Sequence, residues 1–200
     1  MEYNITNYCN IKDNKIFHNG QEIYRNEGEL PFLDFIKGAY KELEIAYPKF
    51  YKMDSLSKLS LIASSVLLDN YKEELDEKMA IVLSNRSSCI DIDRIHQTNI
   101  DEDGIAGARP ANFVYTLPNI SLGEISIKYQ LRSENSFFIF DSFNPNFLIA
   151  YSKSLINLKK CNSLLVGWVE VNEEAYNGFL FMIEPKPGME LTEKKLLELI

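Results

Sequence analysis

The spacing of apolar positions changes from strand-like at the N-terminus to helix-like after residue 30. Tyr3–Ile11 and Lys15–Tyr24 alternate with period two, and His18–Gln21 contains an Asn-Gly pair that supplies positive φ, so we predict a hairpin with a tight turn. Apolar residues then recur every three or four positions over Leu30–Tyr47. This spacing predicts a helix, which Pro48 would end.

Helical and strand patterns alternate from Asp54 onward. Asp54 is a good N-cap for a helix with an apolar stripe from Leu56 to Leu67, and Asn144-Pro145 would begin another helix that continues to about Lys160. Strands are predicted at Met79–Leu83, Ser136–Phe140, Ser163–Val171 and Gly178–Ile183, helices at Phe113–Tyr129 (interrupted at Pro118) and Leu191–Ile200, and a polar loop with a short helix at Ser84–Asp103. The alternation favours an α/β layered sheet, and residues 1–200 show no repeat or linker, so we predict one domain.

Composition excludes several classes of protein. Of 200 residues, 46% are hydrophobic and 12% aromatic, enough for a sizeable core. The net charge of −8 argues against nucleic acid or an anionic membrane as the main partner. No apolar run approaches the ~20 residues that span a bilayer, and Met1–Asn10 does not resemble a signal peptide. Three scattered cysteines, Cys9, Cys89 and Cys161, fit a reducing compartment, so we expect a cytoplasmic protein.

Short motifs give little support to a cofactor or a metal. Ser55–Lys58 matches Ser-x-x-Lys, but the two other elements of that serine chemistry are missing and Ser is common in the first turn of a helix. Asp91-Ile92-Asp93 begins like a calcium loop, yet Ile95 and His96 stand where Asp or Asn and Gly belong. His18 and His96 have no nearby cysteine pair, and no phosphate-binding glycine motif occurs. We expect no cofactor and no metal.

The remaining feature is a strand, a turn and a helix in succession. Phe137–Phe140 is followed by Asp141–Asn144 and then by the helix that Pro145 begins. Acyl-transfer enzymes place a nucleophile at such a turn, because free N–H groups and the helix dipole favour negative charge there. An ordinary β–α turn has the same local sequence, so both interpretations stay open.

The order of segments resembles a known family. The resemblance is carried by Phe50–Leu59, Ile81–Asn85, Phe113–Ile127 (most specifically Leu117–Ile127), Leu164–Glu170 and Gly178–Glu184. Together they are similar to the N-terminal half of a β-ketoacyl-acyl-carrier-protein synthase of the thiolase superfamily, and to the short ketosynthase-like proteins of bacterial aryl-polyene and flexirubin-type pigment clusters. The resemblance implies half of a thiolase-like fold, a mixed sheet with helices on both faces.

The chain departs from the family at the nucleophile. The family's catalytic cysteine corresponds to Ser142, and Asn144 and Pro145 stand where small residues and glycine follow it. The family's two catalytic histidines belong to the C-terminal half. A serine hydroxyl is not ionised at neutral pH and needs a positioned base, whereas a thiol at a helix start is partly ionised. We therefore expect that the chain does not condense acyl groups by itself.

The helix after Ser142 carries two apolar sectors. One contains Phe147, Leu148 and Leu155, and the other contains Ile149 and Ile156. A helix with one covered face needs only one such sector. The second sector would pack against a second copy, a full ketosynthase or a covering element such as the C-terminal residues 191–200. Because exposed apolar faces usually mark interfaces, we expect a homo- or hetero-oligomer.

Three functions remain open at this stage. The first is a non-catalytic ketosynthase-like subunit of fatty-acid, polyene or polyketide synthesis. The second is a Ser142-dependent acyltransferase or thioesterase that takes a base from a partner chain. The third is a module that binds an acyl chain or an acyl carrier protein. Carrier proteins are acidic, so docking needs a local basic patch, for which Lys153, Lys159 and Lys160 are candidates.

Overall fold

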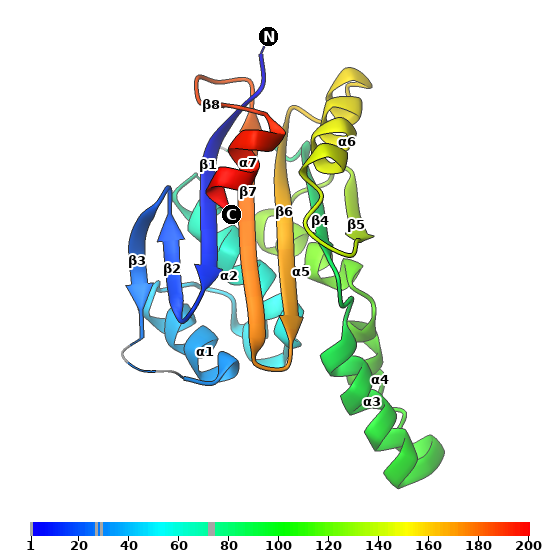
Figure 1. The fold of residues 1–200 in the computed structure, drawn as a ribbon. Helices are drawn as coiled ribbons and strands as arrows, with labels where there is room; N and C mark the ends of the chain where they lie inside the picture. Colours follow the sequence, from blue (N-terminus) through cyan, green and yellow to red (C-terminus); the bar gives the residue numbers. More distant parts are fainter. Residues whose placement is uncertain (1, 27, 29, 72–74) are drawn as a thin grey trace.

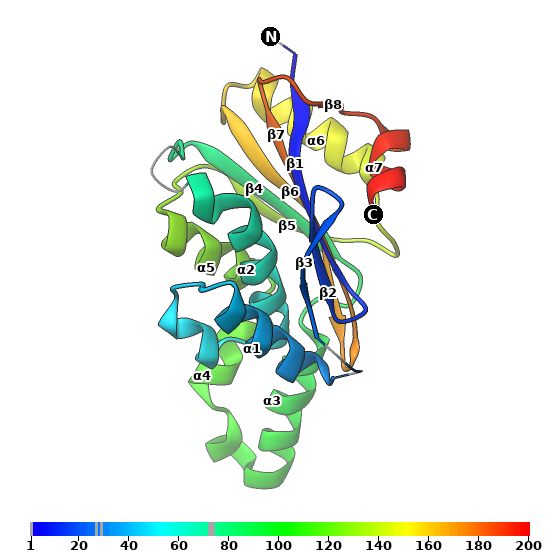
Figure 2. The ribbon, with the colours of Figure 1, turned by 90° about the vertical axis from the view of Figure 1, so that its left-hand side faces the viewer.

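A computed structural model describes residues 2–26, 28, 30–71 and 75–200, and a mixed sheet runs through its middle (Figures 1 and 2). The strands lie in the order β3-β2-β1-β7-β6-β4-β5, and β8 pairs with β1. Their bounds are β1 Asn4–Lys12, β2 Lys15–His18, β3 Gln21–Arg25, β4 Met79–Asn85, β5 Asn135–Ile139, β6 Ser163–Asn172, β7 Ala175–Glu184 and β8 Met189–Glu190. The sheet therefore has β3 at one edge and β5 at the other.

Helices cover both faces of this sheet (Figure 2). In chain order they are α1 Phe32–Glu42, α2 Ser55–Leu68, α3 Ile90–Asp103, α4 Pro110–Phe113, α5 Asn119–Tyr129, α6 Pro145–Asn157 and α7 Glu193–Leu199, with short 3₁₀ turns between several of them. Helices α1, α2 and α5 lie on one face and α6 and α7 on the other, whereas α3 and α4 project beyond the sheet (Figure 1). The predicted α/β class, with a mixed sheet and helices on both faces, is confirmed.

Parallel pairing determines where the helices must lie. Strand β4 runs parallel to both β5 and β6, and β6 returns into β7 as an antiparallel hairpin that reaches β1. Parallel neighbours cannot be joined by a tight turn and need a crossover, which α3 to α5 and then α6 provide. Because β6 lies on the far side of β4, β5 has a partner along one side only among the described strands.

The larger core lies under α2, which is buried on nearly all sides. The Asp54 carboxylate accepts the backbone N–H groups of Leu56 and Ser57, so the predicted N-cap is confirmed. Even the polar residues of this helix are buried: the Ser60 hydroxyl donates to the Leu56 carbonyl at 2.8 Å and the Ser64 hydroxyl to a carbonyl one turn back. Because these hydroxyls donate to carbonyl groups of their own helix, they are paired even though α2 is buried in an apolar core.

The smaller core lies between the sheet and the pair α6 and α7. Leu148 and Leu155 of α6 are buried against the strands, while Ile149 and Ile156 are partly buried in the same cluster. Helix α7 packs beside α6, and its Leu196 is fully buried. The sequence left open what packs against the second apolar sector of α6. The C-terminal residues of the chain are one of the elements that do so.

The predicted loop with a short helix at Ser84–Asp103 is wrong. Strand β4 extends to Asn85, and α3 then runs for 14 residues. No residue of α3 is fully buried, although Ile92 packs against the larger core, so the apolar periodicity that identifies a helix is weak in its sequence. Short-range polar contacts support it instead, such as the Gln97 amide donating to the Asp101 carboxylate at 2.8 Å and the Thr98 hydroxyl donating to a backbone carbonyl.

The predicted N-terminal hairpin is a three-stranded meander. Lys15–Tyr24 divides at Asn19-Gly20, where both residues have positive φ, into strands β2 and β3. The turn between β1 and β2 uses Asp13 and Asn14, also with positive φ. The first helix is shorter than predicted and ends at Glu42, before the left-handed residue Glu44. The remaining strands, the break at Pro118 and the terminal helix lie within a few residues of their predicted positions.

A buried carboxylate fastens the long connection before β5 to the body. Glu124 of α5 is 3% exposed and accepts hydrogen bonds from the hydroxyls of Tyr47 (2.9 Å) and Tyr115 (3.2 Å). Lys49 forms an ion pair with it at 2.7 Å. Burial and the neighbouring carboxylate raise the pKa values of both tyrosines, so they remain hydrogen-bond donors at any working pH.

We expect Glu124→Ala to lower the free energy of unfolding by about 2–3 kcal/mol, because it leaves two tyrosine hydroxyls and a lysine without their partner. Urea unfolding followed by circular dichroism measures the change. Glu134→Ala removes an exposed carboxylate and serves as the control. Equal effects of the two substitutions would contradict the assigned role of Glu124.

Candidate functional site

Ser142 lies in the turn that joins β5 to α6, at the edge of the sheet. Its side chain is exposed and lines an open hollow of about 740 Å³, which we call the Ser142 hollow. Asp141 and Phe143 flank it, and Trp168 and Glu170 of β6 lie on the opposite wall. The hollow is open to solvent and is not an enclosed tunnel of the kind that would hold an acyl chain.

The backbone at the start of α6 offers little stabilisation to an anion. Pro145 has no N–H, and the Asn144 side chain already accepts the N–H of Phe147 at 3.0 Å. The N–H of Leu148 is bonded to the Asn144 carbonyl. In the first turn this leaves the N–H of Asn146 without an intrahelical partner. The predicted cap is confirmed, and it occupies donors that an oxyanion would need.

No imidazole accompanies Ser142 within the described residues. The Ser142 side chain faces solvent, and neither histidine lines the hollow. His18 lies on β2 with its ring nitrogen 3.0 Å from the Asn7 side chain, and His96 lies on α3 with its ring 6.0 Å from that of Phe113. Asp141 is the nearest candidate by sequence and lines the same hollow. The turn therefore places a hydroxyl at a helix start without a histidine to activate it.

The opposite wall of the hollow was not predicted from the sequence. The Glu170 carboxylate accepts the backbone N–H groups of Arg86 (2.7 Å) and Ser87 (3.2 Å), which fixes the chain as it leaves β4. Arg86 and Ser87 also line the hollow. The sequence position of Arg86 and Ser87 after β4 could have indicated this contact with the turn after β5. Residues that follow neighbouring parallel strands meet at the carboxyl edge of a sheet.

The Ser-x-x-Lys motif has a structural role. Lys58 is 6% exposed, donates to the Met53 carbonyl and lies 5.8 Å from the centre of the Phe50 ring. Burial lowers the pKa of Lys58, and the nearby Asp54 carboxylate opposes this shift. Ser55 is simply the first residue of α2.

The acidic residues around His96 also have structural partners. Asp91 accepts the backbone N–H of Glu173 through both oxygens, at 2.9 and 3.0 Å, and so ties α3 to the β6–β7 turn. Arg94 adds contacts to Asn172 and Glu173. Among the residues that the structure describes, no group of three or more His, Cys, Asp or Glu side chains is placed to hold a metal ion.

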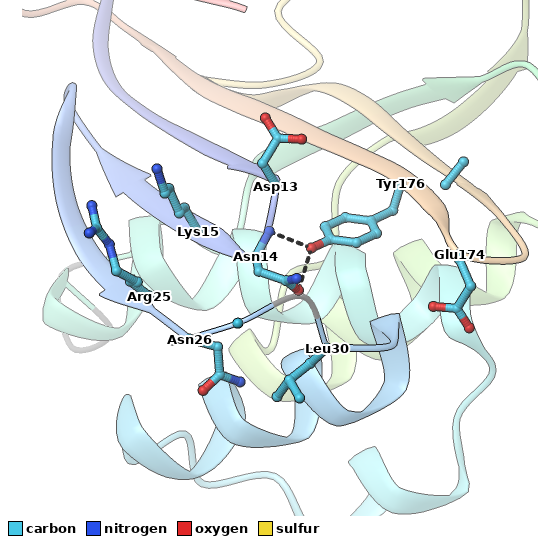
Figure 3. Close-up of a pocket in the computed structure, with 10 residues that line it drawn as sticks. Asp13, Asn14, Lys15, Arg25, Asn26, Leu30, Glu174 and Tyr176 are labelled. Carbon is cyan, nitrogen blue, oxygen red and sulfur yellow. Dashed lines mark hydrogen bonds between the residues drawn. The ribbon is translucent and has the colours of Figure 1, made fainter.

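A larger hollow of about 850 Å³ lies at the turns of the N-terminal meander (Figure 3). The Tyr176 hydroxyl accepts the backbone N–H of Asn14 at 2.8 Å and donates to its side-chain oxygen at 3.0 Å (Figure 3). Glu174 accepts the N–H of Phe32 at the start of α1. These hydrogen bonds connect the β1–β2 turn, the start of β7 and the start of α1. We therefore interpret the hollow as a structural junction.

The free edge of β5 carries a cluster of partly buried aromatic rings. Phe138 lies 4.8 Å from Phe147 and 5.0 Å from Tyr151, and Phe140 lies 5.0 Å from Phe147. On the other side of the strand, Ile139 is 50% exposed. Exposed main chain beside aromatic rings is typical of a surface that pairs with another protein.

Comparison with solved structures identifies the fold. The chain matches "The ishigamide ketosynthase/chain length factor" over 92% of its length with a TM-score of 0.66 and 15% identity. It matches the Xenorhabdus doucetiae complex of the ketosynthase ApeO with its chain length factor ApeC over 100% of its length (TM-score 0.62, 14% identity). A type II polyketide ketosynthase in complex with its acyl-carrier protein, AntDE:AntF, matches over 98% (TM-score 0.62, 13% identity).

This chain has the ketosynthase fold. It covers 62% of the ishigamide chain, 64% of the AntDE:AntF chain and 90% of the matched chain in the ApeO–ApeC complex, so it spans about three fifths of two of these proteins. The fold expected from the sequence resemblance is thus confirmed. A scan against protein-family models and a search of the curated proteins find no match.

The ketosynthase-like chain carries no exposed thiol. Cys9, Cys89 and Cys161 are free and buried, none lines the Ser142 hollow, and burial raises the pKa of each, that of Cys161 to about 11. None of the helices in the described part of the chain is both long and apolar enough to cross a bilayer.

We therefore expect all three thiols to react slowly with Ellman's reagent at pH 8 in the folded protein, because each is both protonated and shielded. Unfolding in urea would release all three within minutes. Raising the pH to 9 should change the folded rate little, since the thiol pKa values lie well above that pH. One fast-reacting thiol in the native protein would contradict this picture.

Proposed function

We propose that this chain is a non-catalytic ketosynthase-like subunit that pairs with an active ketosynthase in polyketide, polyene or fatty-acid synthesis. The observation that carries the proposal is a ketosynthase fold whose turn before α6 presents Ser142 without a thiol, an imidazole or a free set of helix N–H groups. Residues 1–200 would form a single β-ketoacyl synthase N-terminal-like domain. Buried free thiols support a reducing, cytoplasmic location.

The chemistry of Ser142 supports the non-catalytic part. Decarboxylative condensation needs a nucleophile that is ionised or activated and donors for the developing negative charge. Losing one oxyanion donor costs on the order of 10²–10³ in rate. Here Pro145 removes one helix N–H and Asn144 occupies another. The proposed chain would leave condensation to its partner.

The edge of β5 supports the pairing. A parallel edge strand presents unpaired N–H and C=O groups and is a template for a strand from another chain. Beside it lie rigid, partly buried rings of the kind that dominate interface energies: Phe138, Phe140, Phe147 and Tyr151. Two of the similar structures are ketosynthase and chain length factor complexes, which favours a ketosynthase as the partner.

To test the pairing, we propose Ile139→Lys with Ile23→Lys as the matched control. Ile139 is 50% exposed beside the β5 edge, and Ile23 is 38% exposed on β3 at the opposite edge. A charge at the β5 edge should weaken association with a co-expressed ketosynthase at least about tenfold, because a buried unpaired lysine costs more than 1.4 kcal/mol. Light scattering after size exclusion measures the complex.

The control variant should bind the ketosynthase as the wild type does, and both variants should keep the wild-type circular dichroism spectrum. The chain alone in the same measurement detects pairing with itself. No complex with the wild type, or equal loss in both variants, would overturn the proposed interface.

To test the chemistry, we propose intact-mass measurement after incubation with an acylated carrier protein. The wild-type mass should not change, because the Ser142 hydroxyl has no histidine beside it and no hydrogen bond to the carboxylates of the hollow. Ser142→Cys serves as the control for access and should be alkylated by iodoacetamide far faster than the wild type, since the turn is exposed. An acyl adduct on Ser142 would refute the non-catalytic role and favour the acyltransferase alternative.

A further inference from the structure

Four cationic side chains gather at the end of β5 that lies opposite Ser142. An open hollow of about 610 Å³ is lined by Lys78, Arg132, Lys159 and Lys160, with Glu134 and Asn135 between them. We call it the basic hollow. It brings together three connections that are far apart in the sequence: the approach to β4, the approach to β5 and the end of α6.

The cations of the basic hollow are only partly neutralised. Arg132 lies 3.9 Å from Glu77 and Lys160 lies 3.5 Å from Glu134, both as exposed pairs. Such exposed pairs contribute little and yield easily to another partner. Among the described residues, no carboxylate lies within ion-pair distance of Lys78 or Lys159. The hollow is thus a locally positive surface on a chain of net charge −8.

The backbone at Lys159 points to a role beyond solubility. The N–H of Lys160 bonds to the Leu155 carbonyl and that of Lys159 to the Ile156 carbonyl, so α6 ends in a Schellman-type turn. Lys159 occupies the left-handed position of this turn with φ 55°. Glycine is favoured there because it has no Cβ, so a lysine costs stability at this position. Its side chain instead joins the wall of the hollow.

The position of the hollow separates docking from chemistry. Asn135 is the first residue of β5 and Ser142 follows its carboxyl end, so roughly 20 Å of extended chain lies between the two hollows. The candidate lysines suggested by the sequence divide accordingly. Lys159 and Lys160 line the basic hollow, whereas Lys153 lines another surface with Tyr3 and Glu190.

We propose that the basic hollow docks an acidic protein surface, that of the acyl carrier protein that serves the proposed ketosynthase complex. This inference rests on the proposed function for the choice of partner. An acidic partner is repelled by most of a chain with charge −8, so the local positive surface determines where it can approach. Docking there would hold the carrier at the complex without delivering its acyl group to Ser142.

The test is titration of the full chain with a purified acyl carrier protein, with and without its phosphopantetheine group, at low salt. The double variant Arg132→Glu and Lys159→Glu should weaken binding at least about tenfold. The control is Lys153→Glu, because Lys153 belongs to α6 but lies outside the hollow. This substitution should change the affinity for the carrier protein less than twofold. The wild-type affinity should fall steeply with added salt.

A second variant separates binding from folding. Lys159→Gly removes the charge and relieves the left-handed backbone, so it should raise or keep the melting temperature while weakening carrier binding. No saturable binding of either carrier form by the wild type, or equal loss with Lys153→Glu, would overturn the proposal. So would equally tight binding of inorganic phosphate or of a DNA duplex, since either would make the hollow a general anion site.

The outcomes distinguish this inference from the proposed function. Carrier binding through the hollow in a chain that forms no ketosynthase complex would support the docking surface and contradict the subunit role. A ketosynthase complex that does not bind the carrier through these residues would do the opposite.

Discussion

Strand β4 lies between two parallel neighbours, β5 and β6. This pairing determines where the edge strand, the Ser142 turn and the basic hollow lie. Parallel strands need crossovers, so the chain leaves β4, builds α3 to α5, returns as β5, and leaves again through α6 to reach the other side of β4 as β6. The same route leaves β5 at the edge with a bare side. It also places the Ser142 turn at the carboxyl end of β5 and the basic hollow at its amino end.

The two ends of β5 differ in chemistry for local reasons. At the carboxyl end, Asn144 and Pro145 make a stable helix start, and the groups that stabilise it are those that a reaction would otherwise use. At the amino end, Lys159 occupies a left-handed backbone position that usually favours glycine. The carboxyl end is thus stabilised at the expense of hydrogen-bond donors for catalysis. The amino end is less stable but carries an additional positive charge.

Much of the fold could be predicted from the sequence, because strong local signals coincide with burial. The apolar stripe and cap of α2, the Asn144-Pro145 start of α6 and the apolar runs of β4 and β6 all depend on nearby residues. Helix α3 could not be predicted in this way, since its polar residues are held by one another and by the distant β6–β7 turn. For the site, the position of Ser142 was predictable, but Arg86 and Glu170 meet it only through strand order.

In the proposed complex, a ketosynthase covers the bare side of β5. Hydrogen–deuterium exchange of the β5 amides, in the chain alone and in the complex, tests it most directly. We expect about half of these amides, those that do not face β4, to exchange quickly in the chain alone and to slow markedly on complex formation. Unchanged exchange in β5 within a stable complex would contradict it.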